Sequence, residues 1–358
     1  MDPLNMEKIP VGILGATGMV GQKFVSFLRD HPWFDLTWLG ASDRSAGKPY
    51  HEATAWRLGG ETPAYVRDIV VSESKPDVAP RLVFSAMDAS VATEIEQAFA
   101  AAGHTIVSNS RNHRMDADVP LLVPEINADH LRLIPDQQRK RGWNGQIVTN
   151  PNCSTIVLVM ALAPLKQFGI KRVIVTTMQA ISGAGYPGVA SMDINANVVP
   201  FIGGEEEKMQ QETQKILGDL VLGTGGSSVE PLAAKVSAHC NRVPVVDGHT
   251  ITVSIEFEKR PSEEEILRAW RSWRGVPQQK NLPSAPPCPV IYMREPDRPQ
   301  PRRDVERENG MAVFVGRLRK CPVLDYKFVA LGHNTVRGAA GAAVLNAEVM
   351  KAEGYLDQ

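Results

Sequence analysis

The chain has 358 residues, 43% of them hydrophobic and 22% charged, with a formal net charge of −1 at pH 7. This length suggests two domains, and the composition is that of a globular protein with a large core. A charge near zero argues against a nucleic-acid or acidic-membrane surface. The longest apolar run, Ile156 to Leu165, is too short to cross a bilayer, and we expect no secretory signal.

Cysteine spacing bears on redox setting and on metal binding. Cys153, Cys240, Cys288 and Cys321 lie far apart and form no C-x-x-C pair. A zinc ribbon, a redox dithiol and a disulfide framework are therefore disfavoured, so we expect no metal site. A reducing, cytoplasmic location is expected, which would keep Cys153 as a thiol.

A dinucleotide site is predicted at the start of the chain. An expected strand, Lys8 to Leu14, leads into a glycine-rich turn and then into an amphipathic helix from about Val20 to Asp30. The spacing is G-x-x-G-x-x-G, and glycines there let a pyrophosphate approach the helix N-terminus. The residues expected to contact the cofactor are Gly15, Thr17, Gly18, Met19 and Val20.

The loop after the second expected strand, Asp35 to Gly40, should select the cofactor. NAD binders usually place an acidic residue there, whereas NADP binders place donors and positive charge. Ser42 and Arg44, together with Thr17 and Lys48, predict NADP; Asp43 is the residue that would suit NAD.

Strands and helices alternate through the first half of the chain. Strands are expected at Arg81 to Asp88 and Thr105 to Asn109, with a helix over Val91 to Ala102 between them. This α/β pattern predicts a doubly wound, mainly parallel sheet. Ser85 and Ala86 lie near the end of the third strand, at the edge where a cofactor would lie.

The stretch from Thr149 to Thr155, T-N-P-N-C-S-T, joins an expected strand to an apolar helix, Ile156 to Phe168. Ser154 or Thr155 suits the start of that helix. Cys153 would then meet free N–H groups and the positive end of the helix dipole, which favour a thiolate. The alternative is a small, buried hydrophobic cysteine.

In the second half, a strand ending at Gln179 precedes a glycine-rich loop in which Ser182 and Gly183 are expected to approach the cofactor. A polar helix opens near Gly203. Two strand-like runs, 236–246 and 250–259, flank Asp247-Gly248, which is a hairpin signal. The proline-rich segment 277–301 is expected to extend over the surface, and a final helix, 335–350, to pack on the first domain.

Taken together, the motifs resemble the aspartate-β-semialdehyde dehydrogenases, in particular their archaeal and fungal branch. The matching stretches are Gly12 to Gly21, Arg114-Met115, Asn150 to Thr155, Gln179 to Gly185, Gly204 to Lys208, Arg242 to Thr250 and Gly332 to Thr335. They occur in the family's order and cover nearly the whole chain.

The resemblance implies a Rossmann domain (1–150 plus 334–358) and an α+β catalytic and dimerisation domain (151–333). A C-terminal helix would return to the first domain, and a homodimer or homotetramer is expected. The implied reaction is the NADPH-dependent reductive dephosphorylation of L-4-aspartyl phosphate to L-aspartate 4-semialdehyde. This reaction leads to threonine, methionine, isoleucine and, in many organisms, lysine.

The expected chemistry centres on Cys153 as the nucleophile that opens an acyl phosphate to a thioester. His249 would exchange protons with it. The N–H of Cys153, with Asn152 as a second candidate, could hold the oxyanion. By the family's pattern, Gln179 orients the substrate or the cysteine.

The resemblance also assigns the substrate-binding residues. Arg242 would bind the α-carboxylate, and Glu205 the α-amino group, although the adjacent Glu206 is a competing choice. Arg114 and Lys208 would hold the departing phosphate. Asn334 would contact the nicotinamide end of the cofactor.

Three other functions are compatible with parts of the pattern. An N-acetyl-γ-glutamyl-phosphate reductase uses the same chemistry, but its acetamide substrate needs no acid such as Glu205. A malonyl-CoA or succinyl-CoA reductase would keep Cys153 and His249. An NADP-binding sensor without catalysis would be expected to have lost that cysteine or histidine.

Overall fold

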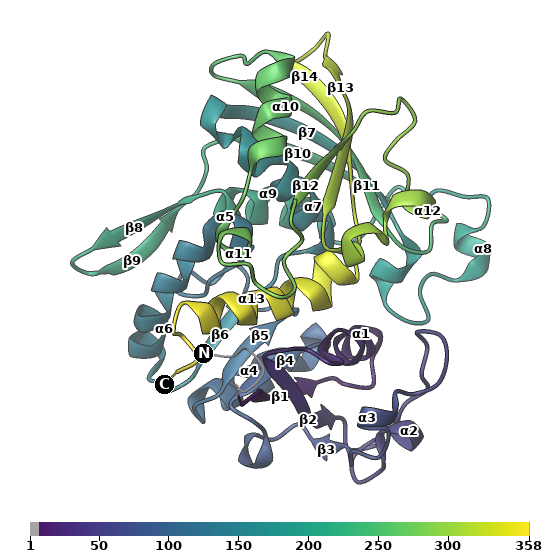
Figure 1. Cartoon of the computed structure of the whole chain (residues 1–358), viewed down its shortest axis with the longest axis vertical. Coiled ribbons are helices and arrows are strands. Elements are labelled where there is room, and N and C mark those ends of the chain that lie inside the picture. Colours follow the sequence, from purple (N-terminus) through teal and green to yellow (C-terminus); the bar gives the residue numbers. More distant parts are fainter. Residues whose placement is uncertain (1–6, 358) are drawn as a thin grey trace.

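The computed structural model describes residues 7–357, which form two six-stranded sheets joined by a buried helix and a returning C-terminal helix (Figure 1). The first sheet has the order β3-β2-β1-β4-β5-β6 and its pairs are parallel. Its strands are β1 (Ile9–Leu14), β2 (Phe34–Ala41), β3 (Ser72–Glu73), β4 (Leu82–Ser85), β5 (Thr105–Ser108) and β6 (Gln146–Thr149). The doubly wound parallel sheet predicted from the sequence is confirmed.

Helices connect these strands in the expected alternation. They are α1 (Met19–Leu28), α2 (Tyr50–Ala53), α3 (Ala64–Arg67), α4 (Ala89–Ala101), α5 (Pro124–Asn127) and α6 (Ile134–Arg141), with short 3₁₀ turns η2 (Pro76–Val78) and η3 (Ala128–Leu133). The N-terminus of α1 follows β1 after the glycine turn, which therefore lies at the carboxyl edge of the sheet.

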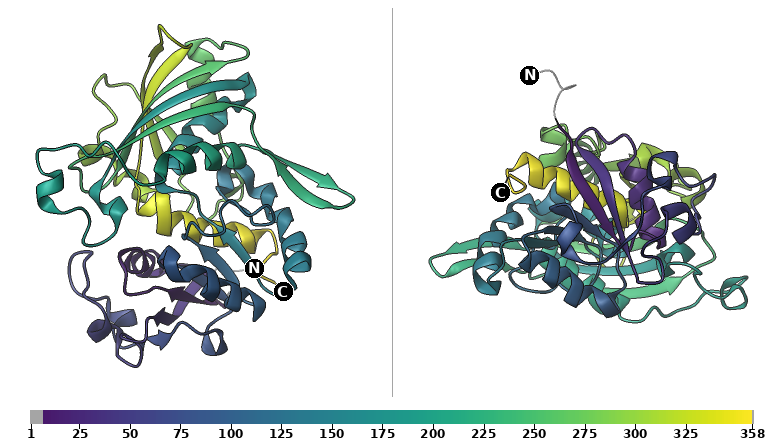
Figure 2. Two further views of the ribbon diagram at one scale, coloured as in Figure 1. Left: turned by 180° about the vertical axis from the view of Figure 1, so that it is seen from behind. Right: turned by 90° about the horizontal axis from the view of Figure 1, so that it is seen from below.

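The second sheet is mixed, with the order β10-β7-β11-β14-β13-β12. Its strands are β7 (Ile170–Gln179), β10 (Lys235–Arg242), β11 (His249–Phe257), β12 (Val290–Met293), β13 (Val313–Lys320) and β14 (Tyr326–Gly332). A separate hairpin of β8 (Asp219–Gly223) and β9 (Gly226–Glu230) extends away from both sheets (Figure 2).

The predicted hairpin between the runs at 236–246 and 250–259 is wrong. β10 pairs in parallel with β7, and β11 pairs with β7 from the other side, so β7 lies between them. The chain between β10 and β11 crosses the end of β7. Gly248, with a φ of +99°, turns the chain into β11 rather than closing a two-stranded hairpin.

The proline-rich segment 277–301 is not simply extended over the surface, as predicted, but contains regular structure. It contains α11 (Val276–Gln279) and β12, which pairs with β13 at the edge of the second sheet, and it ends at α12 (Pro301–Asp304). An edge strand tolerates nearby prolines because only one side of it needs ladder hydrogen bonds.

The remaining helices all follow β6 in the chain. They are α7 (Cys153–Leu162), α8 (Ser191–Ile194), α9 (Glu205–Ile216), α10 (Glu263–Ser272) and α13 (Gly341–Ala352), with η4 (Ala163–Phe168), η5 (Ile181–Ala184), η6 (Arg307–Gly310) and the π-helical turn η7 (Val336–Ala340). Residues Ile156 to Leu162 of α7 are all fully buried. As predicted, the C-terminal helix returns, and η7 and α13 pack against α1 (Figure 1).

A buried ion pair fixes this returning segment. Both terminal nitrogens of Arg337 donate to the carboxylate of Glu125 on α5, at 2.7 and 2.6 Å, and both side chains are fully buried. Removing one partner of such a pair leaves an uncompensated charge in the interior.

We therefore expect Arg337→Met to lower the free energy of unfolding by about 3–5 kcal/mol, measured by urea denaturation. Lys280→Met is the matched control, because the Lys280–Glu353 pair is partly exposed on both sides and should contribute less than about 1 kcal/mol. An equal loss in the two variants would contradict a special role for the buried pair.

Candidate active site

Cys153 is the first residue of α7, and Asn152 is its N-cap. The Oδ1 of Asn152 accepts the backbone N–H groups of Ser154 and Thr155 at 2.9 and 3.2 Å. The prediction that Ser154 or Thr155 starts the helix is therefore wrong by one or two residues. An asparagine can close the first turn from outside the helix, which places the cysteine in that turn.

His249 lies directly against the cysteine. Its Nε2 is 3.1 Å from the Sγ of Cys153, and its Nδ1 accepts the backbone N–H of Ala180 at 3.0 Å. Since Nδ1 is used as an acceptor, the neutral ring carries its proton on Nε2 and presents that N–H to the sulfur. If the ring were protonated, its Nδ1–H and the N–H of Ala180 would be two donors facing each other, which is unfavourable.

The expected thiolate is not the resting form of this site. Burial, reinforced by the charge of Glu205, raises the pKa of Cys153 to about 12, although Arg114 and Arg242 act in the opposite direction. Burial, followed by the positive charge of Arg242, lowers the pKa of His249 to about 3. At neutral pH the pair is therefore a thiol beside a neutral imidazole, because desolvation outweighs the helix dipole.

Glu205, at the first position of α9, faces the nucleophile. Its Oε2 accepts the side-chain amide of Asn152 at 2.7 Å, and its Oε1 accepts Lys208 at 2.9 Å. Glu206 instead accepts the backbone N–H of Cys240 on β10 at 3.1 Å. Of the two candidate acids, Glu205 is the one that lies in the site.

Gln179 and Arg242 lie behind the nucleophile at the ends of β7 and β10. Both are buried. Gln179 Nε2 is 3.4 Å from the Oε2 of Glu205, and an Nη of Arg242 donates to the carbonyl of Ala180 at 2.8 Å. A Cβ on Gly183 would lie 2.8 Å from that Arg242 nitrogen and 3.0 Å from the His249 ring, so a side chain at this loop position would displace Arg242 or the imidazole.

A cleft of about 1160 Å³ runs from the glycine turn to Cys153. It is lined by many of the predicted residues, which are Gly15, Thr17, Gly18, Met19, Val20, Ser42, Ala86, Arg114, Asn152, Cys153, Ser182, Gly183, Glu205, Lys208 and Asn334. At its rim the guanidinium of Arg57 lies 3.5 Å from the ring centroid of Tyr186.

Three predicted cofactor residues, Ser85, Arg44 and Lys48, lie outside this lining. The hydroxyl of Ser85 points into the core and donates to Glu96 at 2.6 Å. Arg44 is exposed and does not line the cleft, whereas Lys75, which the sequence did not single out, does. Loop residues far apart in sequence converge there, so spacing alone could not identify Lys75.

The glycine turn fits a dinucleotide. Gly15 has a φ of +74°, and a Cβ on it would lie 2.7 Å from the carbonyl oxygen of Ala86. A Cβ on Gly21 would lie 2.4 Å from the carbonyl oxygen of Gly15. The turn is therefore tight and has no room for side chains at Gly15 and Gly21, so backbone N–H groups at the start of α1 can donate to phosphate oxygens.

Two further residues beside the nucleophile, Glu212 and Gly338, were not predicted from the sequence. Glu212 accepts the backbone N–H of Asn152 at 2.6 Å, and its spacing from Glu205 and Lys208 on one helix face could have indicated it. Gly338, in η7, is so close that a Cβ on it would lie 2.7 Å from the Cβ of Cys153. Nothing in the local sequence indicates that approach.

Among residues 7–357, no helix has the length and apolar character needed to span a membrane. Within the same residues, no cluster of histidine, cysteine, aspartate and glutamate side chains could hold a metal ion.

Two family models match the chain and together cover most of it. They are "Semialdehyde dehydrogenase, NAD binding domain" over residues 10–134 and "Semialdehyde dehydrogenase, dimerisation domain" over residues 162–337. The chain therefore belongs to the semialdehyde dehydrogenase family.

Within this family the similarity is to aspartate-semialdehyde dehydrogenases. The chain is 52% identical to that of Methanothermobacter thermautotrophicus (96% of this chain, 99% of the relative) and 50% identical to that of Archaeoglobus fulgidus (95% and 97%). A crystal structure of aspartate semialdehyde dehydrogenase with NADP from Candida albicans superposes with a TM-score of 0.90 at 43% identity, covering 98% and 100% of the two chains. The resemblance to the archaeal and fungal branch is confirmed.

The buried imidazole predicts a pH dependence of stability. The pKa of His249 is depressed in the folded chain, so its contribution is fully present above pH 6.5 and is lost as pH falls from 6.5 toward 3. Between pH 7.5 and 5.5, urea unfolding of the wild type should lose about 1.4 kcal/mol more than unfolding of His249→Gln.

His51, a half-buried histidine far from His249 in the sequence, supplies the control, since His51→Gln should keep the wild-type pH dependence. Parallel loss of stability in the wild type and in His249→Gln would show that His249 titrates normally in the folded protein.

Proposed function

We propose that this chain is an NADP-dependent aspartate-semialdehyde dehydrogenase, which converts L-4-aspartyl phosphate into L-aspartate 4-semialdehyde and phosphate. The observation that carries the proposal is the contact between Cys153 and His249 at the end of a dinucleotide cleft that also holds Glu205. The relatives named above carry this activity in their names, and one was crystallised with NADP.

Cys153 is the nucleophile of the proposed mechanism. After its proton has passed to His249, the sulfur forms a bond to the acyl carbon, the carbon–oxygen bond to phosphate breaks, and a thioester results with release of phosphate. Bound NADPH would supply a hydride to the carbonyl carbon of the thioester. The carbon–sulfur bond then breaks, which frees the aldehyde and returns the sulfur to its starting state.

His249 donates its Nε2–H to the sulfur in the resting arrangement, and this hydrogen bond strengthens when the sulfur becomes negative. The proton exchange predicted for His249 remains part of the proposal. It requires the ring to give up the hydrogen bond from Ala180, because Nδ1 cannot carry a proton while accepting that N–H.

The oxyanion of each tetrahedral intermediate would be held at the start of α7. Cys153 is in the first turn of α7, so its N–H has no acceptor within the helix. The backbone N–H of Asn152 is already donated to Glu212, so the side-chain amide of Asn152 is the second donor that we propose. Each such donor typically contributes about 3–4 kcal/mol.

Charge placement supports an amino-acid substrate. Arg242 would bind its α-carboxylate and Glu205 its α-amino group, with Gln179 beside them. Arg114 and Lys208 would hold the phosphate. A buried carboxylate such as Glu205 suits an ammonium group better than the acetamide of an N-acetylated substrate.

We also propose a cytoplasmic homodimer built on the second sheet. Alternate residues of β7 and β10, including Ile174 and His239, leave one face of that sheet exposed, while α7 and α9 cover the other. A second copy of the chain would cover this face, in agreement with the name of the family's second domain.

The decisive assay is phosphate-dependent formation of NADPH from NADP and L-aspartate 4-semialdehyde. We expect turnover by the wild type and a loss of at least about 10³-fold in Cys153→Ala, with NADP affinity retained. Cys321→Ala, a free cysteine outside the cleft, is the matched control and should stay active.

Faster turnover of N-acetylglutamate semialdehyde would instead identify an N-acetyl-γ-glutamyl-phosphate reductase, and preference for malonyl-CoA or succinyl-CoA would identify a CoA-thioester reductase. NADP binding without turnover of any of these substrates would leave the sensor function.

Cofactor choice gives a second test of the site. Ser42, Lys75 and the nearby Arg44 are the candidates to meet a 2′-phosphate. We expect Arg44→Ala and Lys75→Ala each to raise the KM for NADP about 10-fold while changing the KM for NAD little. If only Lys75→Ala has this effect, the sequence assignment of Arg44 is wrong; equal weakening of both cofactors would discard both assignments.

A further inference from the structure

Glu212, on α9, is a buried carboxylate that touches two separate parts of the site. Its Oε2 accepts the backbone N–H of Asn152 at 2.6 Å, and its Oε1 accepts an Nη1–H of Arg114 at 3.0 Å. Its exposed fraction is 1%. One side chain therefore connects the residue immediately before the nucleophile to a cleft-lining arginine.

Arg114 depends on this contact for the orientation of its guanidinium. Its Nη2 donates to the carbonyl of Asn109 at 2.8 Å, and its buried Nε has no hydrogen-bond partner among residues 7–357. The two occupied nitrogens, Nη1 and Nη2, fix the plane of the group. The remaining N–H groups are left for a ligand of the cleft.

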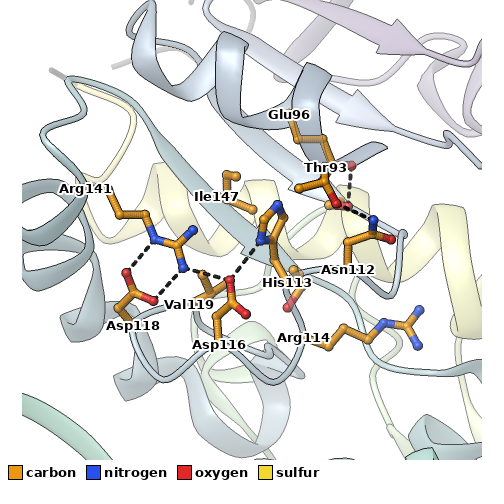
Figure 3. Close-up of polar contacts among 12 residues, drawn as sticks. Thr93, Glu96, Asn112, His113, Arg114, Asp116, Asp118, Val119, Arg141 and Ile147 are labelled. Carbon is orange, nitrogen blue, oxygen red and sulfur yellow. Dashed lines mark hydrogen bonds and ion pairs between the residues drawn. The ribbon is translucent and has the colours of Figure 1, made fainter. Parts of the chain in front are cut away.

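The backbone that carries Arg114 is held independently. His113 contacts Asp116 at 2.9 Å, and Arg141 donates to both Asp116 and Asp118. Figure 3 shows this cluster on one side of the loop, with the Arg114 side chain pointing away from it.

Lys215, one turn beyond Glu212 on α9, completes that support. Its buried ammonium group donates to the carbonyls of Arg114, Asp116 and Val119 at 2.7–2.9 Å. Because these contacts fix the loop backbone, the loss of Glu212 should release the side chain of Arg114 rather than unfold the loop.

We propose that Glu212 is a positioning residue that sets the Arg114 guanidinium relative to Cys153 for binding of the phosphate group. This inference rests on the proposed function and assigns a residue that the family resemblance did not indicate. The carboxylate of Glu212 offsets the positive charge of the Arg114 guanidinium, so it does not strengthen phosphate binding by simple attraction. Its contribution is orientation, since the same group also holds the turn that carries the nucleophile.

The test is Glu212→Gln, which keeps the size of the side chain and an oxygen that can still accept the N–H of Asn152. In the phosphorylating direction, with L-aspartate 4-semialdehyde and NADP, we expect the KM for inorganic phosphate to rise about 10- to 100-fold. The KM for NADP should change less than about 2-fold. Glu207→Gln is the matched control, since Glu207 lies on the exposed side of the same helix.

A double variant shows whether Glu212 acts through Arg114. If it does, Arg114→Gln combined with Glu212→Gln should have the same KM for phosphate as Arg114→Gln alone. The thermal midpoint of each variant monitors folding.

An unchanged or lower KM for phosphate in Glu212→Gln would overturn the proposal, as would additive losses in the double variant. Equal increases in the KM values for phosphate and NADP would indicate a general structural role and would also overturn it. The proposed function is judged separately, by phosphate-dependent turnover of the wild type.

Discussion

The hydrogen bonds of Asn152 are the constraint on which the rest of the site depends. Its Oδ1 caps α7, its side-chain amide reaches Glu205, and its backbone N–H reaches Glu212. A residue held at all these points has little freedom, so the sulfur on the next residue is placed with respect to both α7 and α9. The chemistry proposed for this chain relies on that rigidity more than on a reactive resting thiolate, because burial keeps the thiol protonated.

The two sheets meet at the nucleophile. Cys153 follows β6 of the first sheet, and His249 is the first residue of β11 in the second sheet. Gly338, in η7 of the returning C-terminal segment, lies directly against the cysteine. The Arg337–Glu125 pair holds η7 in the interior beside that contact. Stability and site geometry are therefore linked, since the segment that packs against α1 also forms a wall of the site.

Local patterns were sufficient for much of this fold. The strand, glycine turn and helix at the start of the chain and the polar helix α9 follow from short-range rules, and the structure contains each of them. The pairing of β10 and β11 with β7 could not be inferred in this way, because Asp247-Gly248 describes a turn without saying which strands it joins. The raised pKa of Cys153 was missed for a similar reason: desolvation depends on the whole fold, whereas the dipole argument uses one helix.

The spacing along α9 has a consequence for how this chain can vary. Glu205, Lys208, Glu212 and Lys215 follow one another by three, four and three residues, so they share one side of the helix and reach the substrate pocket, the cap of α7 and the Arg114 loop in turn. Successive residues of an α-helix are rotated by about 100° around the helix axis. A single insertion or deletion between Glu205 and Lys215 would therefore rotate part of this set away from its partners, although the helix itself would still form. The length of α9 between these residues should thus be far less tolerant of insertion or deletion than its exposed face is of substitution.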